Sequence, residues 1–216
     1  MELAKYIEHT LLKQDATREE LLKLFEEAKK FGFLGVCINP VNVALAKQYL
    51  KDTDIKIVTV VGFPLGANLS SVKAFETQMA VKDGADEIDM VINVSKIKDK
   101  DWDFVQKDIE EVKKACADKP LKVILETDLL TREEIAKACE ICVKAQADFV
   151  KTSTGFVKNG TGAKAEDVKL MADTVKPHGL RVKASAGIRD KEKALAMINA
   201  GADRLGTSSG AAIVSG

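Results

Sequence analysis

Gly84-Ala85-Asp86-Glu87-Ile88-Asp89-Met90-Val91-Ile92 is the stretch that decides the predicted fold. A charged segment runs into a glycine, a small residue and an acid, and a short apolar run follows. This order is typical of a helix that ends at a glycine cap and passes into a buried strand. Similar stretches recur along the chain at residues 30–38, 144–151 and 199–206. The sequence therefore predicts helices that alternate with buried strands.

Further short apolar runs have the same strand character. They are Ile55 to Val61, Leu121 to Glu126, Leu180 to Ala184 and a shorter one near Tyr6 to His9. Together the runs give about eight strand and helix units, which suit a closed barrel better than an open doubly wound sheet. No GxGxxG follows the first strand to argue for a dinucleotide. We predict one α/β domain over residues 1–216, a (β/α)8 TIM barrel whose short last helix covers about Ser209 to Val214.

The composition excludes several classes of partner. The 33 basic and 33 acidic residues cancel, so no overall field draws the chain to nucleic acid or to an anionic membrane. No window approaches the roughly 20 apolar residues of a membrane span, and the N-terminal residues lead into no apolar signal core. We expect a cytoplasmic protein that binds neither nucleic acid nor membrane and that holds any anion at a local site.

The cysteines suggest thiols more than a disulfide framework. Cys139 and Cys142 form a CxxC pattern, but they lie in the helical run Arg132 to Ala145 with no second pair nearby. A zinc or redox role is the alternative to two cysteines on the inner face of a helix. With only His9 and His178 in the chain, we expect no catalytic metal site.

In such a barrel the active site lies at the carboxyl ends of the strands, so polar residues that close each apolar run are the candidates. They are Glu8, Cys37, Asp89, Glu126, Lys151, Lys183 and the turn Gly206-Thr207-Ser208-Ser209.

Lys151 and Lys183 stand out because nearly all other lysines fall on helical stretches, where a solvated position is the default. On adjacent strands six and seven, the two side chains are expected to face one cavity. Like charge and desolvation both lower a lysine pKa, which leaves a free amine to attack a carbonyl. The alternative is that both lysines merely pair with barrel carboxylates.

Asp89 closes the fourth strand. Alternation along the strand points Asp89 and Glu87 to one face and Ile88 to the other. A carboxylate beside two lysines would tune their charges and relay protons during carbinolamine formation and dehydration. A salt bridge that only orders Lys183 is the alternative.

Six blocks, in order, resemble the motifs of deoxyribose-phosphate aldolases over almost the whole chain. They are Tyr6-Ile7-Glu8-His9-Thr10-Leu11-Leu12-Lys13, Gly35-Val36-Cys37-Ile38-Asn39-Pro40, Val60-Val61-Gly62-Phe63-Pro64-Leu65-Gly66, Gly84-Ala85-Asp86-Glu87-Ile88-Asp89-Met90-Val91-Ile92-Asn93, Asp148-Phe149-Val150-Lys151-Thr152-Ser153-Thr154-Gly155-Phe156 and Val182-Lys183-Ala184-Ser185-Ala186-Gly187-Ile188-Arg189.

The resemblance implies reversible cleavage of 2-deoxy-D-ribose 5-phosphate to acetaldehyde and D-glyceraldehyde 3-phosphate in deoxyribonucleotide catabolism. It implies that Lys151 forms the Schiff base, that Lys183 lowers the pKa of Lys151 and that Asp89 serves the proton relay. No metal or other cofactor is expected. The expected partners are phosphosugar and aldehyde substrates and a second copy of the chain, in a homodimer or higher homo-oligomer.

The resemblance also implies the substrate-binding residues. Cys37 lines the pocket, and no histidine is placed by sequence to activate it as a nucleophile. Glu8 stands where an aspartate is usual and is expected near a substrate hydroxyl. The phosphate is expected at the loops after strands six, seven and eight, whose backbone N–H groups and hydroxyls suit an anion. These residues are Thr154, Gly155, Gly187, Gly206, Ser208 and Ser209.

Two further positions depart from the family motifs, and we expect them to affect catalytic efficiency more than the type of reaction. Ala186 replaces the first glycine of a usual pair, where a methyl could crowd the phosphate or stiffen the loop. Gln146 replaces a glycine at a helix end. Two other functions stay open: another Schiff-base aldolase of the fructose-phosphate or transaldolase kind, and a silent barrel that only binds a phosphosugar.

Overall fold

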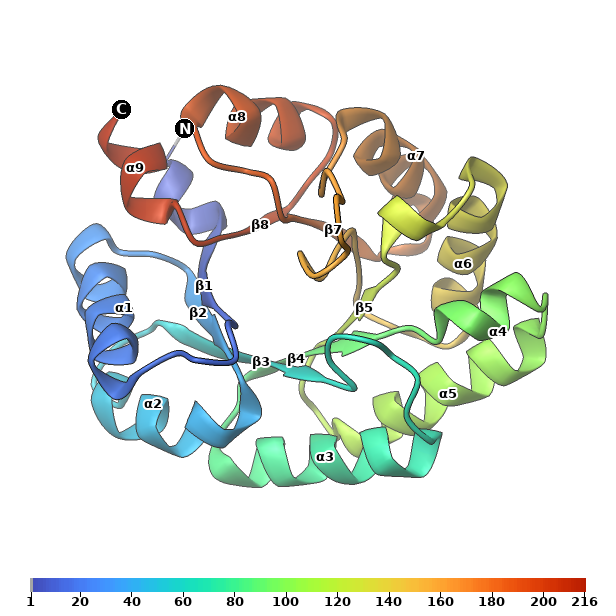
Figure 1. Ribbon diagram of the computed structural model, residues 1–216, viewed down its shortest axis with the longest axis horizontal. Helices are drawn as coiled ribbons and strands as arrows, with labels where there is room; N and C mark the ends of the chain where they lie inside the picture. The colour runs from blue at the N-terminus through green and yellow to red at the C-terminus, as the bar shows by residue number, and fades with distance from the viewer. Residues whose placement is uncertain (1) are drawn as a thin grey trace.

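Residues 2–216, which the computed structural model describes, form a closed barrel of eight parallel strands wrapped by helices (Figure 1). The strand order follows the chain from β1 to β8, and Ile7 of β1 pairs with Leu205 of β8 to close the ring. The predicted TIM barrel is confirmed.

The strands are β1 (Ile7–Leu11), β2 (Gly35–Ile38), β3 (Lys56–Val61), β4 (Glu87–Val91), β5 (Leu121–Ile124), β6 (Phe149–Lys151), β7 (Arg181–Ser185) and β8 (Arg204–Thr207). The α-helices are α1 (Arg18–Phe31), α2 (Val43–Leu50), α3 (Ser70–Asp83), α4 (Val94–Lys98), α5 (Trp102–Ala115), α6 (Arg132–Lys144), α7 (Ala165–Val175), α8 (Lys191–Asn199) and α9 (Gly210–Ser215). Short 3-10 helices are η1 (Leu3–Tyr6), η2 (Pro40–Asn42), η3 (Thr127–Leu129) and η4 (Lys176–His178). Within the described residues, no helix has the length and apolar character needed to cross a membrane.

An aspartate directly before β4, β6 and β8 explains the acid in the recurring sequence pattern. Asp86 before β4 accepts a hydrogen bond from the Ile57 amide at 2.9 Å. In the same way Asp148 before β6 accepts from Leu121, and Asp203 before β8 accepts from Val182. Each carboxylate therefore satisfies a backbone donor at or next to the start of the preceding strand.

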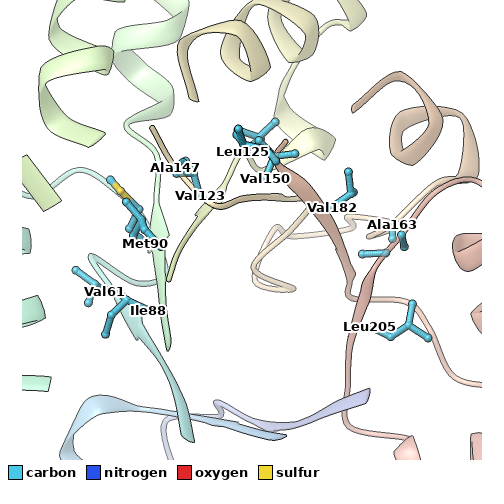
Figure 2. Close-up of a cluster of buried hydrophobic side chains, with 14 of the residues drawn as sticks. Val61, Ile88, Met90, Val123, Leu125, Ala147, Val150, Ala163, Val182 and Leu205 are labelled. Atoms are coloured by element: carbon cyan, nitrogen blue, oxygen red, sulfur yellow. The ribbon is translucent and has the colours of Figure 1, made fainter. Parts of the chain in front are cut away.

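Most of the hydrophobic core lies between the strands and the helices. Ile88 and Met90 of β4 and Val123 of β5 belong to this layer on the outer side of the barrel, as Figure 2 shows. Because side chains alternate along a strand, the residues between them face the barrel interior. A smaller apolar cluster contains Cys37 of β2 with Val58 and Val60 of β3.

The interior contributed by β1 and β4 to β7 is instead ionic. Glu8, Asp89, Lys122 and Lys183 are each fully buried, although charged groups are costly to bury without partners. The buried charged side chains in this part of the barrel interior therefore position the candidate site.

The expectation that helical lysines lie in solvent is wrong at one position. Lys73 of α3 is fully buried and donates to Asp108 of α5 at 2.6 Å and to the Val91 carbonyl at 3.0 Å. This ion pair ties two neighbouring outer helices to the carboxyl end of β4. A lysine in a charged helical stretch gives no sequence signal for such burial.

Candidate active site

A cavity of about 390 Å³ opens at the carboxyl end of the barrel, where the sequence predicts the site. Its lining includes six of the predicted residues, which are Lys151, Thr154, Gly155, Gly187, Gly206 and Ser208. The side chains of Glu8, Cys37, Asp89 and Lys183 are completely buried beside Lys151. The cavity therefore exposes one lysine of this group, and the others support that lysine from within the barrel.

Lys151 ends β6 and is 3% exposed. Its Nζ donates to Oδ2 of Asp89 at 2.7 Å. The β6 and β7 register pairs Lys151 directly with Lys183, so the two side chains share a face, as the sequence predicts. Lys151 is thus held at the floor of the cavity by a carboxylate and lies beside a second lysine.

Lys183 is enclosed by two carboxylates. Its Nζ donates to Oδ2 of Asp89 at 2.7 Å and to Glu8 of β1. Burial lowers the pKa of Lys183, but Asp89 and Glu8 outweigh this cost and hold the pKa well above its usual value. Lys183 is therefore a fixed positive charge. Both lysines therefore pair with carboxylates, which is the alternative that the sequence left open. This pairing is compatible with a reactive amine on Lys151.

Lys122 of β5 is a member of the site that sequence reasoning missed. Its buried Nζ lies 2.9 Å from Oδ1 of Asp89, 2.6 Å from Glu87 and 3.6 Å from Glu8. Burial lowers the pKa of Lys122, yet the surrounding carboxylates raise it overall. The sequence signal for Lys122 is its place inside the apolar run Leu121 to Ile124, where alternation along the strand turns its side chain into the barrel.

Asp89 lies at the centre of these contacts. Lys122 binds one oxygen, while Lys151 and Lys183 bind the other. Burial raises the pKa of Asp89, but the three ammonium groups outweigh it and hold the pKa well below its usual value. Asp89 is consequently an ionised acceptor at neutral pH, and Glu87 lies on the same face, as predicted.

The charges of this ion cluster balance without Lys151. We define the ion cluster as Glu8, Glu87, Asp89, Lys122, Lys151, Lys183 and Arg204, whose Nε lies 3.8 Å from Glu8. The three carboxylates are matched by three cations, Lys122, Lys183 and Arg204. A neutral Lys151 amine therefore leaves no carboxylate without a counter-charge, and a proton on Lys151 adds a surplus positive charge.

Cys37 of β2 is fully buried beside the ion cluster. Burial raises the pKa of its thiol in spite of the nearby Lys183 and Lys151 charges. A thiol that keeps its proton is a weak nucleophile, so Cys37 fits apolar packing behind the cavity and not an attacking group.

The loops after β6, β7 and β8 meet around the cavity. Thr154 does not hold a free hydroxyl there, because its Oγ1 donates to Glu126 and accepts from the Phe156 amide at 3.0 Å. The Ser209 amide donates to Oγ1 of Thr207 at 2.9 Å, while the exposed Ser208 lines the cavity. Arg189 also lines it. Thr154 and Ser209 thus support the loops, and Gly155, Gly187, Gly206 and Ser208 border the open space.

Cys139 and Cys142 face the interior from α6 and are buried free thiols. Burial raises the pKa of Cys139 to about 12 and raises that of Cys142 well above its usual value. In the part of the chain that is described, no three His, Cys, Asp or Glu side chains gather as a metal-binding group. The CxxC pattern therefore falls on the inner face of a helix.

A family model described as DeoC/LacD family aldolase matches residues 3–216, which is nearly the whole chain. The chain belongs to the DeoC/LacD aldolases. The deoxyribose-phosphate aldolase of Finegoldia magna is 58% identical over 216 residues, with 100% of each chain covered. That of Thermococcus gammatolerans is 56% identical over 220 residues, covering 100% of this chain and 96% of the relative.

A solved structure, described as the unique tetrameric structure of deoxyribose phosphate aldolase from Aeropyrum pernix, superposes with a TM-score of 0.89. It is 33% identical, and the match covers 99% of this chain and 89% of that chain. The family resemblance drawn from the six motifs is confirmed.

Ala186, Gln146 and Glu8 are the positions at which the chain departs from the family motifs. Ala186 follows β7 with a left-handed backbone, φ 68°, and the Cβ that Gly155 lacks would lie 3.5 Å from its methyl. Gln146 after α6 is also left-handed, φ 57°, and its side chain is exposed. Glu8 contacts Lys183 and approaches Lys122 and Arg204 inside the barrel, so its longer arm serves the ion cluster.

Proposed function

We infer that this chain is a deoxyribose-phosphate aldolase, which reversibly cleaves 2-deoxy-D-ribose 5-phosphate to acetaldehyde and D-glyceraldehyde 3-phosphate. The observation that carries the mechanism is Lys151 at the cavity floor, bound to Asp89 within an ion cluster whose other charges already balance. A lysine amine that faces the cavity and is not needed as a counter-charge is the kind of nucleophile that Schiff-base chemistry requires.

In the proposed cycle the Lys151 amine attacks C1 of the open-chain sugar and forms a carbinolamine. Loss of water gives a protonated imine. A base takes the proton of the C3 hydroxyl, the C2–C3 bond breaks and its electron pair moves into the imine, giving an enamine and glyceraldehyde 3-phosphate. Protonation of the enamine at C2 and hydrolysis then release acetaldehyde and restore Lys151.

The neighbours of Lys151 have distinct parts in this cycle. Lys183 keeps its proton, so it is a positive charge beside the nucleophile Lys151. Asp89 contacts both ammonium groups and accepts hydrogen bonds throughout. Because its pKa is low, we assign Asp89 to organising proton transfer near Lys151 and not to storing the proton.

We place the phosphate at the loops that end β6, β7 and β8. Gly155, Gly187, Gly206 and Ser208 border the cavity there, and Arg189 offers a cation at its edge. Backbone N–H groups bind phosphate well where no side chain blocks the approach.

Reductive trapping tests the nucleophile. Acetaldehyde and borohydride should attach covalently to Lys151 and leave Lys183 unmodified, as mapped by peptide mass spectrometry. Lys151→Met is the control and should show no adduct. An adduct on Lys183, or none on the wild type, contradicts the assignment, and the latter result favours the silent barrel.

A coupled assay for glyceraldehyde 3-phosphate tests the reaction itself. Wild-type protein should release it from deoxyribose 5-phosphate at a rate that a chelator leaves unchanged, because the protonated imine is the electron sink that a metal would otherwise supply. Cleavage of fructose phosphates, with no cleavage of deoxyribose 5-phosphate, would favour the other Schiff-base aldolases.

We also propose a homo-oligomer that buries an apolar stripe on and beside α3. Leu65, Leu69 and Phe75 are 75%, 72% and 64% exposed, and Val72 and Met79 continue the stripe along the helix. Such a contiguous exposed surface is typical of a protein interface. Light scattering should give a mass above one chain, and Leu69→Glu with Phe75→Glu should reduce it.

A cytoplasmic location fits this activity, because phosphorylated sugars carry charges that do not cross membranes freely.

A further inference from the structure

The connection from β5 to α6 places a buried carboxylate behind the loop that follows β6. Oε1 of Glu126 accepts the Thr154 amide at 3.0 Å, and Oε2 accepts the Thr154 hydroxyl. The Thr154 hydroxyl in turn accepts the Phe156 amide at 3.0 Å. Glu126 thus fixes Thr154, and through it Phe156, by hydrogen bonds that leave the Thr154 hydroxyl fully engaged.

Asp128, two residues later in the chain, holds the far end of the same loop. Its two oxygens accept the Thr161 hydroxyl at 2.9 Å and the Gly162 amide at 2.8 Å. The next amide, that of Ala163, donates to the Ala186 carbonyl at 3.1 Å and joins the loop to the end of β7. The segment 152–164 is therefore held at both ends, with Glu126 nearest the reacting groups.

Glu126 lies behind the part of the loop that borders the active-site cavity. Thr154, Gly155 and Phe156 line that cavity, whereas Glu126 and Asp128 line an adjoining cavity of about 150 Å³. The two cavities share Gly155, Ala186, Gly187 and Arg189. Glu126 is 4% exposed. Both of its oxygens accept hydrogen bonds from Thr154, so we expect Glu126 to act on a substrate through the loop.

The backbone of Glu126 is itself unusual. Its φ and ψ are both 61°, in the left-handed region where a residue with a Cβ is disfavoured by about 1–2 kcal/mol. Burial also raises the pKa of its carboxyl, with the Thr154 hydrogen bonds acting against that rise. A strained conformation and a desolvated acid persist only where surrounding contacts over-determine them, and such positions cluster at functional sites.

We propose that Glu126 is a positioning residue that sets the phosphate edge of the active site by holding Thr154, Gly155 and Phe156 in place relative to Lys151. This inference rests on the phosphate position given under the proposed function. It assigns Glu126 a part in substrate preference without contact to the substrate.

The test compares Glu126→Leu, Glu126→Gln and the control Glu140→Gln, which changes an exposed carboxylate on α6. Glu126→Leu should raise KM for deoxyribose 5-phosphate roughly tenfold or more, since it removes two hydrogen bonds to a charged acceptor. KM for unphosphorylated deoxyribose and the rate of acetaldehyde trapping at Lys151 should stay within about twofold. Glu126→Gln keeps one acceptor and should fall between Glu126→Leu and wild type.

Thr154→Val gives an independent check, because it removes the hydroxyl that Glu126 holds. In the double variant Glu126→Gln with Thr154→Val, the loss of apparent binding free energy for deoxyribose 5-phosphate should be much smaller than the sum of the losses in the two single variants. Both changes break the same hydrogen-bond network. Additive losses would show that the two side chains act separately and would overturn the proposal.

Amide hydrogen exchange supplies a readout that needs no catalysis. The peptide over residues 152–164 should exchange at least about tenfold faster in Glu126→Leu at an unchanged melting temperature, while exchange in the control matches wild type. Unchanged exchange, or equal loss on both substrates and in trapping, overturns the inference even if the aldolase reaction stands. If the wild type is not trapped by acetaldehyde but Glu126→Leu still exchanges faster, the role of Glu126 in holding the loop stands and the proposed aldolase reaction does not.

Discussion

Lys151 and Lys183 donate hydrogen bonds to the same oxygen, Oδ2 of Asp89, each at 2.7 Å. One carboxylate oxygen therefore holds the proposed nucleophile and its cationic neighbour close together. The register of β6 and β7 places the two lysines side by side, and Asp89 reaches them from β4. A change at any of the three positions should therefore alter the hydrogen bonds and the charge balance around the other two.

Lys183→Leu should lower turnover roughly a hundredfold or more, within the usual range for groups that control proton transfer. Without Lys183 the cluster has three carboxylates but only two cations besides Lys151, so the charge balance that leaves a free Lys151 amine is lost. Trapping with acetaldehyde and borohydride should recover partly as the pH is raised. Asp89→Leu should lose similar activity without that recovery, and near wild-type turnover in either variant would favour a purely structural salt bridge.

Lys122→Met should destabilise the protein by about 3–5 kcal/mol, the usual cost of leaving buried partner charges uncompensated. Urea unfolding measures this, with the exposed Lys107→Met as the control, expected within about 0.5 kcal/mol of wild type. If both variants were equally stable, Lys122 would not be part of a working ion cluster.

The pH dependence of that difference follows from the pKa shifts. The raised pKa of Lys122 means that its stabilisation is complete below the unfolded value of about 10.4 and is lost as pH rises through the higher folded value. The lowered pKa of Asp89 means that its stabilisation is complete above about 3.9 and is lost as pH falls through the folded value. The gap between wild type and Lys122→Met should therefore be widest between these limits and narrow outside them.

Ser208→Asp should lower kcat/KM for deoxyribose 5-phosphate roughly tenfold or more. Two unit charges at about 4 Å repel by about 1 kcal/mol in water and by more in a partly desolvated cleft, and a phosphate carries more than one. Acetaldehyde trapping at Lys151 should be intact, and turnover of unphosphorylated deoxyribose should be spared or improved. Equal losses on both sugars would show that this turn lies away from the phosphate.

Gln146→Gly should stabilise the protein by about 1 kcal/mol, because glycine adopts the left-handed backbone after α6 without the Cβ penalty. For a chain of this size that corresponds to a rise in Tm of about 2–4 °C. Gln146→Ala is the matched control, since it shortens the side chain and keeps the penalty. A rise in both variants would mean that the glutamine side chain, and not the backbone, causes the strain.

The sequence predicted the elements whose signal is local. Alternation within short runs located the barrel strands and the shared face of Lys151 and Lys183, and the polar residues that close each run marked the site. Lys122 was not predicted, because a lysine inside a buried strand is stable only beside carboxylates, and those come from β1 and β4, far away in the sequence. The support that Glu126 gives to Thr154 depends on a left-handed backbone and on a loop 28 residues away, which no pattern along the chain encodes.

The ion cluster also determines when the chain can become active during its synthesis. Glu8 meets Lys183 across 175 positions, and Arg204 reaches Glu8 from the last strand. A nascent chain that has released β1 to β6 from the ribosome holds Lys151, Asp89 and Lys122 but lacks Lys183 and Arg204, which are two of the three cations that balance the carboxylates. We therefore expect Lys151 to become reactive only when β7 and β8 dock on β1 and complete the charge balance of the ion cluster. Reactivity toward acetaldehyde would therefore report ring closure on partly synthesised chains.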